Sequence, residues 1–174
     1  MKNIISASLA VLSFLGLRPA AHALATGDEA PRVSARDQNG VEVALADIYL
    51  KGPTLVYFYP KADTGGCTAQ ACSLRDAFPD FSGAGVQIIG VSGDSVENQK
   101  KFAEKYDLPF TLLADTDSAV ANAFGVPHIM GIPKRQSFII KDGKVAWIVR
   151  GAKTRDHAAE VQAALAELGL VKKS

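Results

Sequence analysis

Residues 54–72 read TLVYFYPKADTGGCTAQAC and contain the passage from a buried strand into a helix. Thr54 to Tyr59 are β-branched and aromatic without strict alternation, which is typical of a strand covered on both faces. Pro60 ends that strand, and the polar loop KADTGG leads into Cys67. Beyond Cys67 the pattern predicts a helix, which Pro79 kinks or stops, because apolar residues recur at helical spacing at Ala71, Leu74, Phe78 and Phe81.

The flanking sequence predicts further strands and helices. Asn39-Gly40 is a strong hairpin signal within residues 32–45, because both residues tolerate positive φ. Residues 86–92 (VQIIGVS) have the composition of another buried strand. Asp94, followed three residues later by Glu97, resembles a capping box that opens a helix through Tyr106.

The C-terminal part continues the alternation. We expect a short strand at 112–114, a short helix at 118–124, and a hairpin in which Asp142-Gly143 joins 137–141 to 144–149. Val161, Leu165 and Leu168 mark an amphipathic helix that Gly169 can terminate. This order predicts one α/β domain: a central mixed sheet flanked by helices, with an N-terminal β-hairpin.

The first 23 residues have the features of a secretory signal. Lys2 precedes the uncharged apolar run 4–17, and Ala21-His22-Ala23 offers the small-x-small pattern of a cleavage site. The run is shorter than the roughly 20 residues that cross a bilayer, so we expect no stable membrane insertion; an uncleaved anchor is the alternative. We therefore expect a signal peptide at 1–23, a mature domain at 24–174, and an exported protein, periplasmic after cleavage near Ala23.

Composition excludes several classes of function. The 174 residues are 48% apolar and 21% charged, typical of a globular domain. Nineteen Lys and Arg side chains stand against eighteen Asp and Glu. Nucleic acids and anionic membranes require a concentrated positive surface, so we expect neither as a partner.

The chain has two cysteines, Cys67 and Cys72, in a C-x4-C arrangement. In an exported protein a permanent structural disulfide is one interpretation. A redox role is the other, because a cysteine in a first helical turn lies in the positive field of the helix dipole, which favours the thiolate. If both lie on one intact helix, their Cα atoms are about 8–9 Å apart. A disulfide requires less than about 7 Å, so the helix would have to unwind for the pair to form.

Metal binding is a further alternative. Cys67 and Cys72 with His128 could hold copper or zinc, but an i,i+5 spacing separates two helical ligands by about 140°, whereas ligands on one face are three or four residues apart. Of the other histidines, His22 lies in the expected signal and His157 in the last helix. The sequence contains no C-x-x-C-H for haem and no C-x-x-C of an ordinary disulfide oxidoreductase. We expect no metal and no cofactor.

The residues from Phe58 to Cys67 (FYPKADTGGC) resemble the peroxiredoxin active-site pattern Pro-x-x-x-Thr-x-x-Cys. The continuation to Cys72 resembles the Q-type (bacterioferritin-comigratory-protein-like) subgroup, and residues 90–95, 101–103 and 108–110 match it in order. Arg135, in RQSF, is similar to the family's second-site arginine. Two residues depart from the subgroup: Gly65 stands where proline is usual, and Gln70 where glutamate is common.

The resemblance implies a thioredoxin-like core and a role for each site residue. Cys67 would attack the peroxide and become a sulfenic acid, which Cys72 would resolve as a disulfide. Arg135 would donate to thiolate and peroxide, although a surface ion pair is its alternative. Thr64 would hydrogen-bond peroxide and sulfur, or merely cap the helix. Pro60 would shield the pocket, or merely end the strand.

The resemblance also implies partners. The substrate would be hydrogen peroxide or an organic hydroperoxide, and a dithiol protein would reduce the disulfide by exchange. Outside the cytoplasm we expect an exported thioredoxin-like or glutaredoxin-like reductant, acting on a monomer.

Overall fold

The computed structural model describes residues 23–171, so the expected signal segment lies outside the described residues apart from Ala23. The central sheet has seven strands in the order β2-β1-β5-β4-β3-β8-β9. Its strands are β1 (Ser34–Asp37), β2 (Glu42–Ala44), β3 (Thr54–Phe58), β4 (Gln87–Ser92), β5 (Thr111–Ala114), β8 (Gln136–Lys141) and β9 (Lys144–Arg150). Strands β3, β4 and β5 run parallel, and the other pairings are antiparallel. The predicted mixed sheet and N-terminal hairpin are confirmed.

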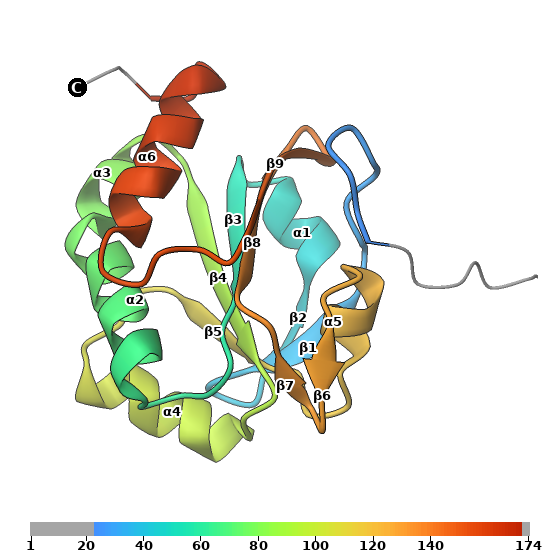
Figure 1. Ribbon diagram of the computed structural model, residues 1–174, viewed down its shortest axis with the longest axis vertical. Helices are drawn as coiled ribbons and strands as arrows, with labels where there is room; N and C mark the ends of the chain where they lie inside the picture. Colours follow the sequence, from blue (N-terminus) through green and yellow to red (C-terminus); the bar gives the residue numbers. More distant parts are fainter. Residues whose placement is uncertain (1–22, 172–174) are drawn as a thin grey trace, which may run out of the picture.

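Helices cover both faces of this sheet (Figure 1). They are α1 (Leu45–Tyr49), α2 (Gly65–Asp76), α3 (Phe78–Gly83), α4 (Val96–Lys105), α5 (Ala119–Ala123) and α6 (His157–Glu167). Buried residues of α2, α3, α4 and α6 form one core cluster with the sheet, and those of α1 and α5 form another. In the described part of the chain no helix is long and apolar enough to span a membrane.

Strand β3 lies between β4 and β8 and is buried along its whole length, as its composition predicts. Because side chains alternate across a strand, Leu55 and Tyr57 point to the α2 side, whereas Val56 and Phe58 point to the α5 side. Tyr59, just past the strand, joins the α2 side. The loop that leads to Cys67 begins at the carboxyl end of this central strand.

One helix boundary agrees with the sequence-based expectation and one differs. Helix α2 ends at Asp76, and α3 starts at Phe78 with Pro79 in its first turn, where a missing N–H costs nothing, so the predicted interruption near Pro79 is confirmed. Helix α4 is capped by Ser95, whose hydroxyl accepts from Asn98 N, so the predicted capping box at Asp94 is wrong. A serine one residue later offers the same acceptor, and Asp94 is used elsewhere.

Three elements were not predicted. Helix α1 has only five residues. Strand β6 (His128–Ile129) pairs with β7 (Ile132–Pro133) in a small separate hairpin. Met130 and Gly131 form its turn, both with positive φ. Strands of two residues flanked by prolines give no alternating pattern to recognise.

Candidate active site

Cys67 is the third residue of α2, and its side chain is only 2% exposed. Thr64 is the N-cap in extended conformation, and the first helical bond runs from Thr68 N to the Thr64 carbonyl at 2.8 Å. The N–H groups of Gly65, Gly66 and Cys67 therefore have no acceptor within the helix. They concentrate positive potential at the sulfur.

Arg135 contacts the Cys67 sulfur from the start of a neighbouring strand. It stands immediately before β8, and its Nη2 donates to Cys67 Sγ at 3.3 Å. The guanidinium lies close over the first turn of α2, since a Cβ on Gly66 would be 3.6 Å from Arg135 Nη2. The structure thus brings together two predicted residues that are 68 positions apart, and Arg135 is not a surface ion-pair residue.

Gln70 is a site residue to which the sequence had assigned no role. It is fully buried on α2, one turn after Cys67, and its Oε1 accepts from Arg135 Nη1. One guanidinium edge is thereby fixed while Nη2 remains directed at the sulfur. Because an amide carries no charge, the positive charge of Arg135 is not neutralised as it would be by a carboxylate at this position.

Thr64 and Pro60 occupy the loop in front of Cys67. The hydroxyl of Thr64 donates to the Lys61 carbonyl at 3.0 Å and does not cap α2, so the helix-cap alternative holds for its backbone position but not for its side chain. Thr64 is exposed, and no recorded contact joins its hydroxyl to the sulfur in this structure. Pro60 is half-buried and lines the groove described below.

The loop itself is held from both sides. Ala62 N donates to Asp94 Oδ2 at 2.8 Å, which is the use that the structure makes of Asp94. The carboxylate of Asp63 accepts from Lys105 Nζ at 2.8 Å and from the Tyr106 hydroxyl at 2.6 Å. The bond from Lys105, followed by that from Tyr106, lowers the pKa of Asp63. These contacts fix the loop that precedes Cys67, although Gly65 stands where proline is usual in the subgroup.

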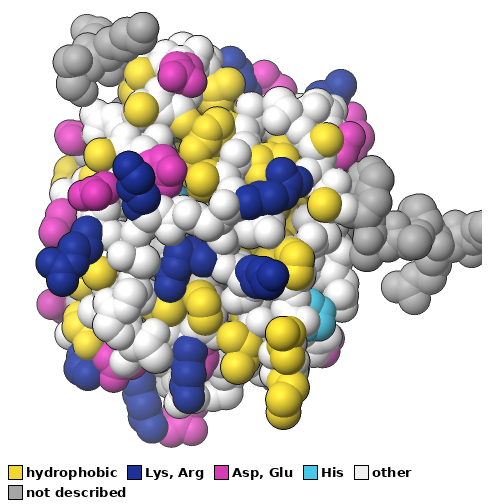
Figure 2. All heavy atoms as spheres, viewed as in Figure 1, with side chains coloured by type: hydrophobic (Ala, Val, Ile, Leu, Met, Phe, Trp, Pro, Cys, Tyr) yellow, Lys and Arg dark blue, Asp and Glu magenta, His cyan; other side chains and the backbone are white. Residues whose placement is uncertain are grey.

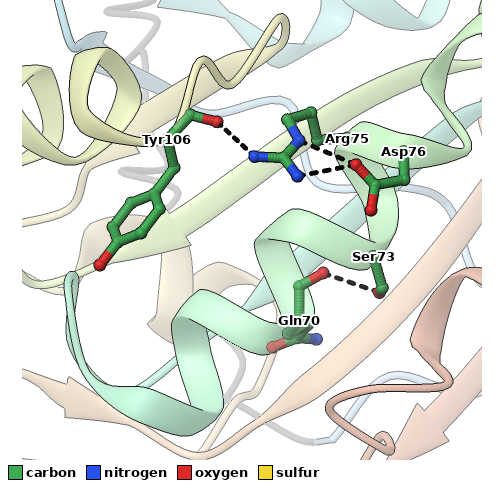
Figure 3. Close-up of polar contacts among 5 residues, drawn as sticks. All are labelled: Gln70, Ser73, Arg75, Asp76 and Tyr106. Carbon is green, nitrogen blue, oxygen red and sulfur yellow. Dashed lines mark hydrogen bonds and ion pairs between the residues drawn. The ribbon is translucent and has the colours of Figure 1, made fainter.

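Cys72 lies on the same uninterrupted helix as Cys67, as predicted, and both are free thiols. It is half-buried and lies about 1.4 turns further along the helix. The end of α2 is fastened beyond it, as Figure 3 shows: Arg75 Nη1 donates to the Tyr106 carbonyl at 2.9 Å, and Asp76 accepts two bonds from the same guanidinium. The helix is therefore anchored at its C-terminal end, whereas two glycines begin it.

An apolar groove of about 770 Å³ opens beside Arg135. Its lining comes from the loop after β3, the β6–β7 hairpin and the adjoining ends of β8 and β9, namely Pro60, Pro127, Ile129, Met130, Ile132, Pro133, Lys134, Arg135, Gln136, Arg150 and Gly151. Figure 2 shows hydrophobic side chains protruding over the hairpin at the lower right, with Lys and Arg side chains nearby. An apolar group can therefore lie next to the residue that holds the sulfur.

The metal alternative had grouped His128 with the two cysteines. His128 lies on β6, and its Nε2 is 3.1 Å from Asn122 Oδ1. Within residues 23–171 no three His, Cys, Asp or Glu side chains are grouped in a manner that could hold a metal ion.

A buried thiol at a helix N-terminus, held by arginine at the edge of a helix-flanked mixed sheet, defines a thiol redox protein of thioredoxin-like fold. The model of the AhpC/TSA family matches residues 26–148. The chain therefore belongs to the AhpC/TSA family, and its relatives are peroxiredoxins of the Q and Bcp type.

Three relatives illustrate the similarity. Peroxiredoxin Bcp of Escherichia coli is 45% identical over 142 residues, covering 77% of this chain and 90% of that protein. The chloroplastic peroxiredoxin Q of Oryza sativa subsp. japonica is 45% identical over 126 residues, which is 70% of this chain but 57% of the rice protein. The crystal structure of peroxidoxin BcpB from Mycobacterium tuberculosis superposes with a TM-score of 0.77 at 34% identity, covering 82% of this chain and 97% of that one.

Proposed function

We propose that this chain is a thiol-dependent peroxidase that reduces hydrogen peroxide and organic hydroperoxides through Cys67. The observation that carries the proposal is the bond from Arg135 Nη2 to Cys67 Sγ at 3.3 Å, at the N-terminus of α2. The guanidinium that contacts the sulfur has further N–H groups, so the same fork can bind a peroxide oxygen next to the attacking sulfur. Family membership supports the same reaction class.

In the first step the Cys67 thiolate attacks one peroxide oxygen. The O–O bond breaks, the sulfur becomes a sulfenic acid, and the other oxygen leaves as water or an alcohol after protonation. Arg135 stabilises the charge that develops on the leaving oxygen. The N–H groups of the first turn of α2, which have no acceptor within the helix, also stabilise this charge. Thr64 can hydrogen-bond the peroxide only if its hydroxyl turns away from the Lys61 carbonyl, to which it donates in this structure.

In the second step the Cys72 thiol condenses with the sulfenic acid, which forms the Cys67–Cys72 disulfide and releases water. Both cysteines lie on intact α2, where the helix geometry separates their Cα atoms by about 8–9 Å. The disulfide requires less than about 7 Å, so the start of α2 must unwind. A thioredoxin-like or glutaredoxin-like dithiol protein then restores both thiols by exchange.

The groove supports organic hydroperoxides as substrates alongside hydrogen peroxide. Six of its lining residues are proline, isoleucine or methionine, and Ile129, Met130 and Ile132 are largely exposed. An alkyl or aryl group placed there would be removed from water while its peroxide end reached Arg135. The proposed acting form is a monomer.

Export is the further part of the proposal. Ala23 is exposed, whereas Leu24 is buried and its carbonyl accepts from Arg150 Nη2 at 2.7 Å. Cleavage after Ala23 would leave this attachment intact. N-terminal sequencing of the periplasmic fraction should begin at Leu24, and recovery of Met1 on a membrane-bound product would support the anchor instead.

Thiol titration tests the peroxidase. The reduced protein should show two thiols, and one equivalent of hydrogen peroxide should remove both within seconds. A structural disulfide would show no thiols beforehand, and a copper carrier would react slowly and bind the metal. Either result would contradict the proposal.

A further inference from the structure

Gly93 and Gly131 make a backbone contact that leaves no room for a side chain. Gly93 follows β4, and Gly131 is in the turn of the β6–β7 hairpin. A Cβ on Gly93 would lie 2.0 Å from the Gly131 carbonyl oxygen and 3.0 Å from its carbonyl carbon. The obstructing atoms belong to the backbone, so no change of rotamer could relieve the overlap. Any side chain at position 93 must displace the hairpin.

Asp94, the residue after Gly93, contacts the loop that contributes Pro60 to the opposite wall of the groove. Asp94 Oδ2 accepts from Ala62 N at 2.8 Å and from Ser92 Oγ at 2.7 Å. Ala62 belongs to the same loop as Pro60. The three-residue turn 92–94 therefore contacts the cysteine loop through Asp94 and the hairpin through Gly93, and it sets the spacing between the two walls.

Movement of the hairpin turn need not reach Arg135. Lys134 N donates to the Pro127 carbonyl at 2.8 Å and closes the base of the hairpin. The Arg135 carbonyl accepts from Gly151 N at 2.9 Å, and its guanidinium is held by Gln70 and Cys67. The hairpin turn and the reacting sulfur are thus positioned by separate contacts.

We propose that Gly93 determines peroxide specificity: by seating the β6–β7 hairpin against the turn 92–94, it gives the groove the width that accepts an organic hydroperoxide. This inference rests on the proposed peroxidase function. Hydrogen peroxide has no apolar group to place in the groove, so its reaction depends on Cys67 and Arg135 and not on the hairpin. Gly93 acts through the hairpin and is a positioning residue.

The test compares Gly93→Ala with Gly83→Ala. Gly83 is a matched control because it lies in α3 without positive φ, and a Cβ there would meet nothing within 4 Å. The values of kcat/KM for cumene hydroperoxide and hydrogen peroxide are measured with dithiothreitol as reductant, after circular dichroism has shown that each variant is folded. The ratio is the value for cumene hydroperoxide divided by that for hydrogen peroxide. In Gly93→Ala this ratio should fall at least about five-fold, which corresponds to about 1 kcal/mol. In Gly83→Ala the ratio should equal that of the unaltered protein.

A second variant keeps the test decisive if Gly93→Ala does not fold. Met130 is 95% exposed with φ of 51°, a conformation that asparagine tolerates, so Met130→Asn removes part of the apolar wall without disturbing the core. Its ratio should also fall.

The outcomes are distinguishable. An unchanged or raised ratio in either variant overturns the inference. Equal losses with both peroxides in Gly93→Ala also overturn it, because they would mean that residue 93 acts on the cysteine loop. If the unaltered protein consumes only hydrogen peroxide, the specificity role fails and the peroxidase stands; if it consumes neither, both fail.

Discussion

Strand β3 sends its side chains into two interiors of different chemistry. On the α2 side, Tyr57 and Tyr59 lie in the same cluster as Cys67. On the α5 side, the buried members of the cluster, Phe58 among them, carry only hydrocarbon side chains. Phe58 packs edge to face against Phe124 and Phe138, with ring centroids 5.3 and 6.0 Å away.

The α2 side holds buried polar groups as well as rings. The Tyr59 hydroxyl donates to Gln99 Oε1, and Ser137 Oγ lies 3.0 Å from His157 Nε2. Burial lowers the pKa of His157, against the opposing effect of the hydrogen bond that Glu160 accepts from it, and burial raises the pKa of Tyr57. Cys67 therefore lies on one face of the sheet, while the core cluster of the other face contributes apolar burial. Substitutions on the two faces should separate activity from stability.

The largest effect is expected from the reacting sulfur. Cys67→Ser should abolish peroxide consumption, since a serine hydroxyl is almost wholly protonated at neutral pH, while the free energy of unfolding should change little. Cys72→Ser is the matched control: it should still consume one equivalent of peroxide but form no intramolecular disulfide. Turnover by Cys67→Ser with a dithiol reductant would refute the assignment of the nucleophile.

The opposite face should show the reverse behaviour. Phe58→Ala should lower the free energy of unfolding by about 3–5 kcal/mol, because it leaves a cavity between Phe124 and Phe138. Phe58→Leu, which keeps most of the volume, should lose less. Urea unfolding measures both changes. The folded fraction should retain its rate constant for hydrogen peroxide within about two-fold, and a loss comparable to that of a site variant would show that the faces are not independent.

Arg135 gives the next effect in size. Arg135→Met keeps bulk but removes donors to the sulfur and to Gln70, each charge-assisted bond being worth about 1.5–3 kcal/mol. The second-order rate constant with hydrogen peroxide should fall at least about ten-fold in stopped-flow measurements. Lys153→Met removes the same charge from an exposed loop position and should have little effect. Equal rates for the two variants would assign only a general electrostatic role to Arg135.

Oxidation should loosen only the reactive face. Disulfide formation must unwind the start of α2, so amide hydrogen-exchange protection across Ala69–Leu74 should fall at least about ten-fold, equivalent to about 1.4 kcal/mol. Amides of α5, on the other face, serve as the internal reference. Equal protection of α2 in reduced and oxidised protein would contradict the unwinding.

The smallest effects compare two tyrosines on the same face. Tyr59→Phe should cost about 1 kcal/mol of stability, because Gln99 Oε1 loses its donor. Within residues 23–171 no hydrogen-bond partner is recorded for the Tyr57 hydroxyl, so Tyr57→Phe should be neutral or slightly stabilising. Thermal unfolding of both variants measures the difference, and a greater loss for Tyr57→Phe would reveal a bond to its hydroxyl.

Much of the fold could be predicted from local signals. The composition of β3 indicates burial on both faces, and positive φ at Asp142 and Gly143 confirms the second hairpin turn. The shared helix of Cys67 and Cys72 followed from apolar spacing. Arg135 was found through its resemblance to a family pattern, because a lone arginine before a strand carries no signal of a partner 68 residues away.

The remaining features depend on tertiary contacts. Gln70 is a buried amide on a helix, and nothing in its neighbourhood along the chain indicates that Arg135 will meet it. Ser95 and not Asp94 caps α4, because the Asp94 carboxylate instead accepts a hydrogen bond from the backbone of Ala62, 32 residues away. The turn of the β6–β7 hairpin packs against the backbone of Gly93, a tertiary contact that no periodicity in the sequence predicts.

The bond between Arg150 and the Leu24 carbonyl has a practical consequence for labelling the protein. Arg150 also lines the apolar groove, so the cleavage proposed after Ala23 would place the new amino group of Leu24 close to that groove. A fluorophore coupled to an amino group at that residue would sense occupancy of the groove. A purification tag at the same place would obstruct it, and tags belong instead at the end of the chain that follows α6.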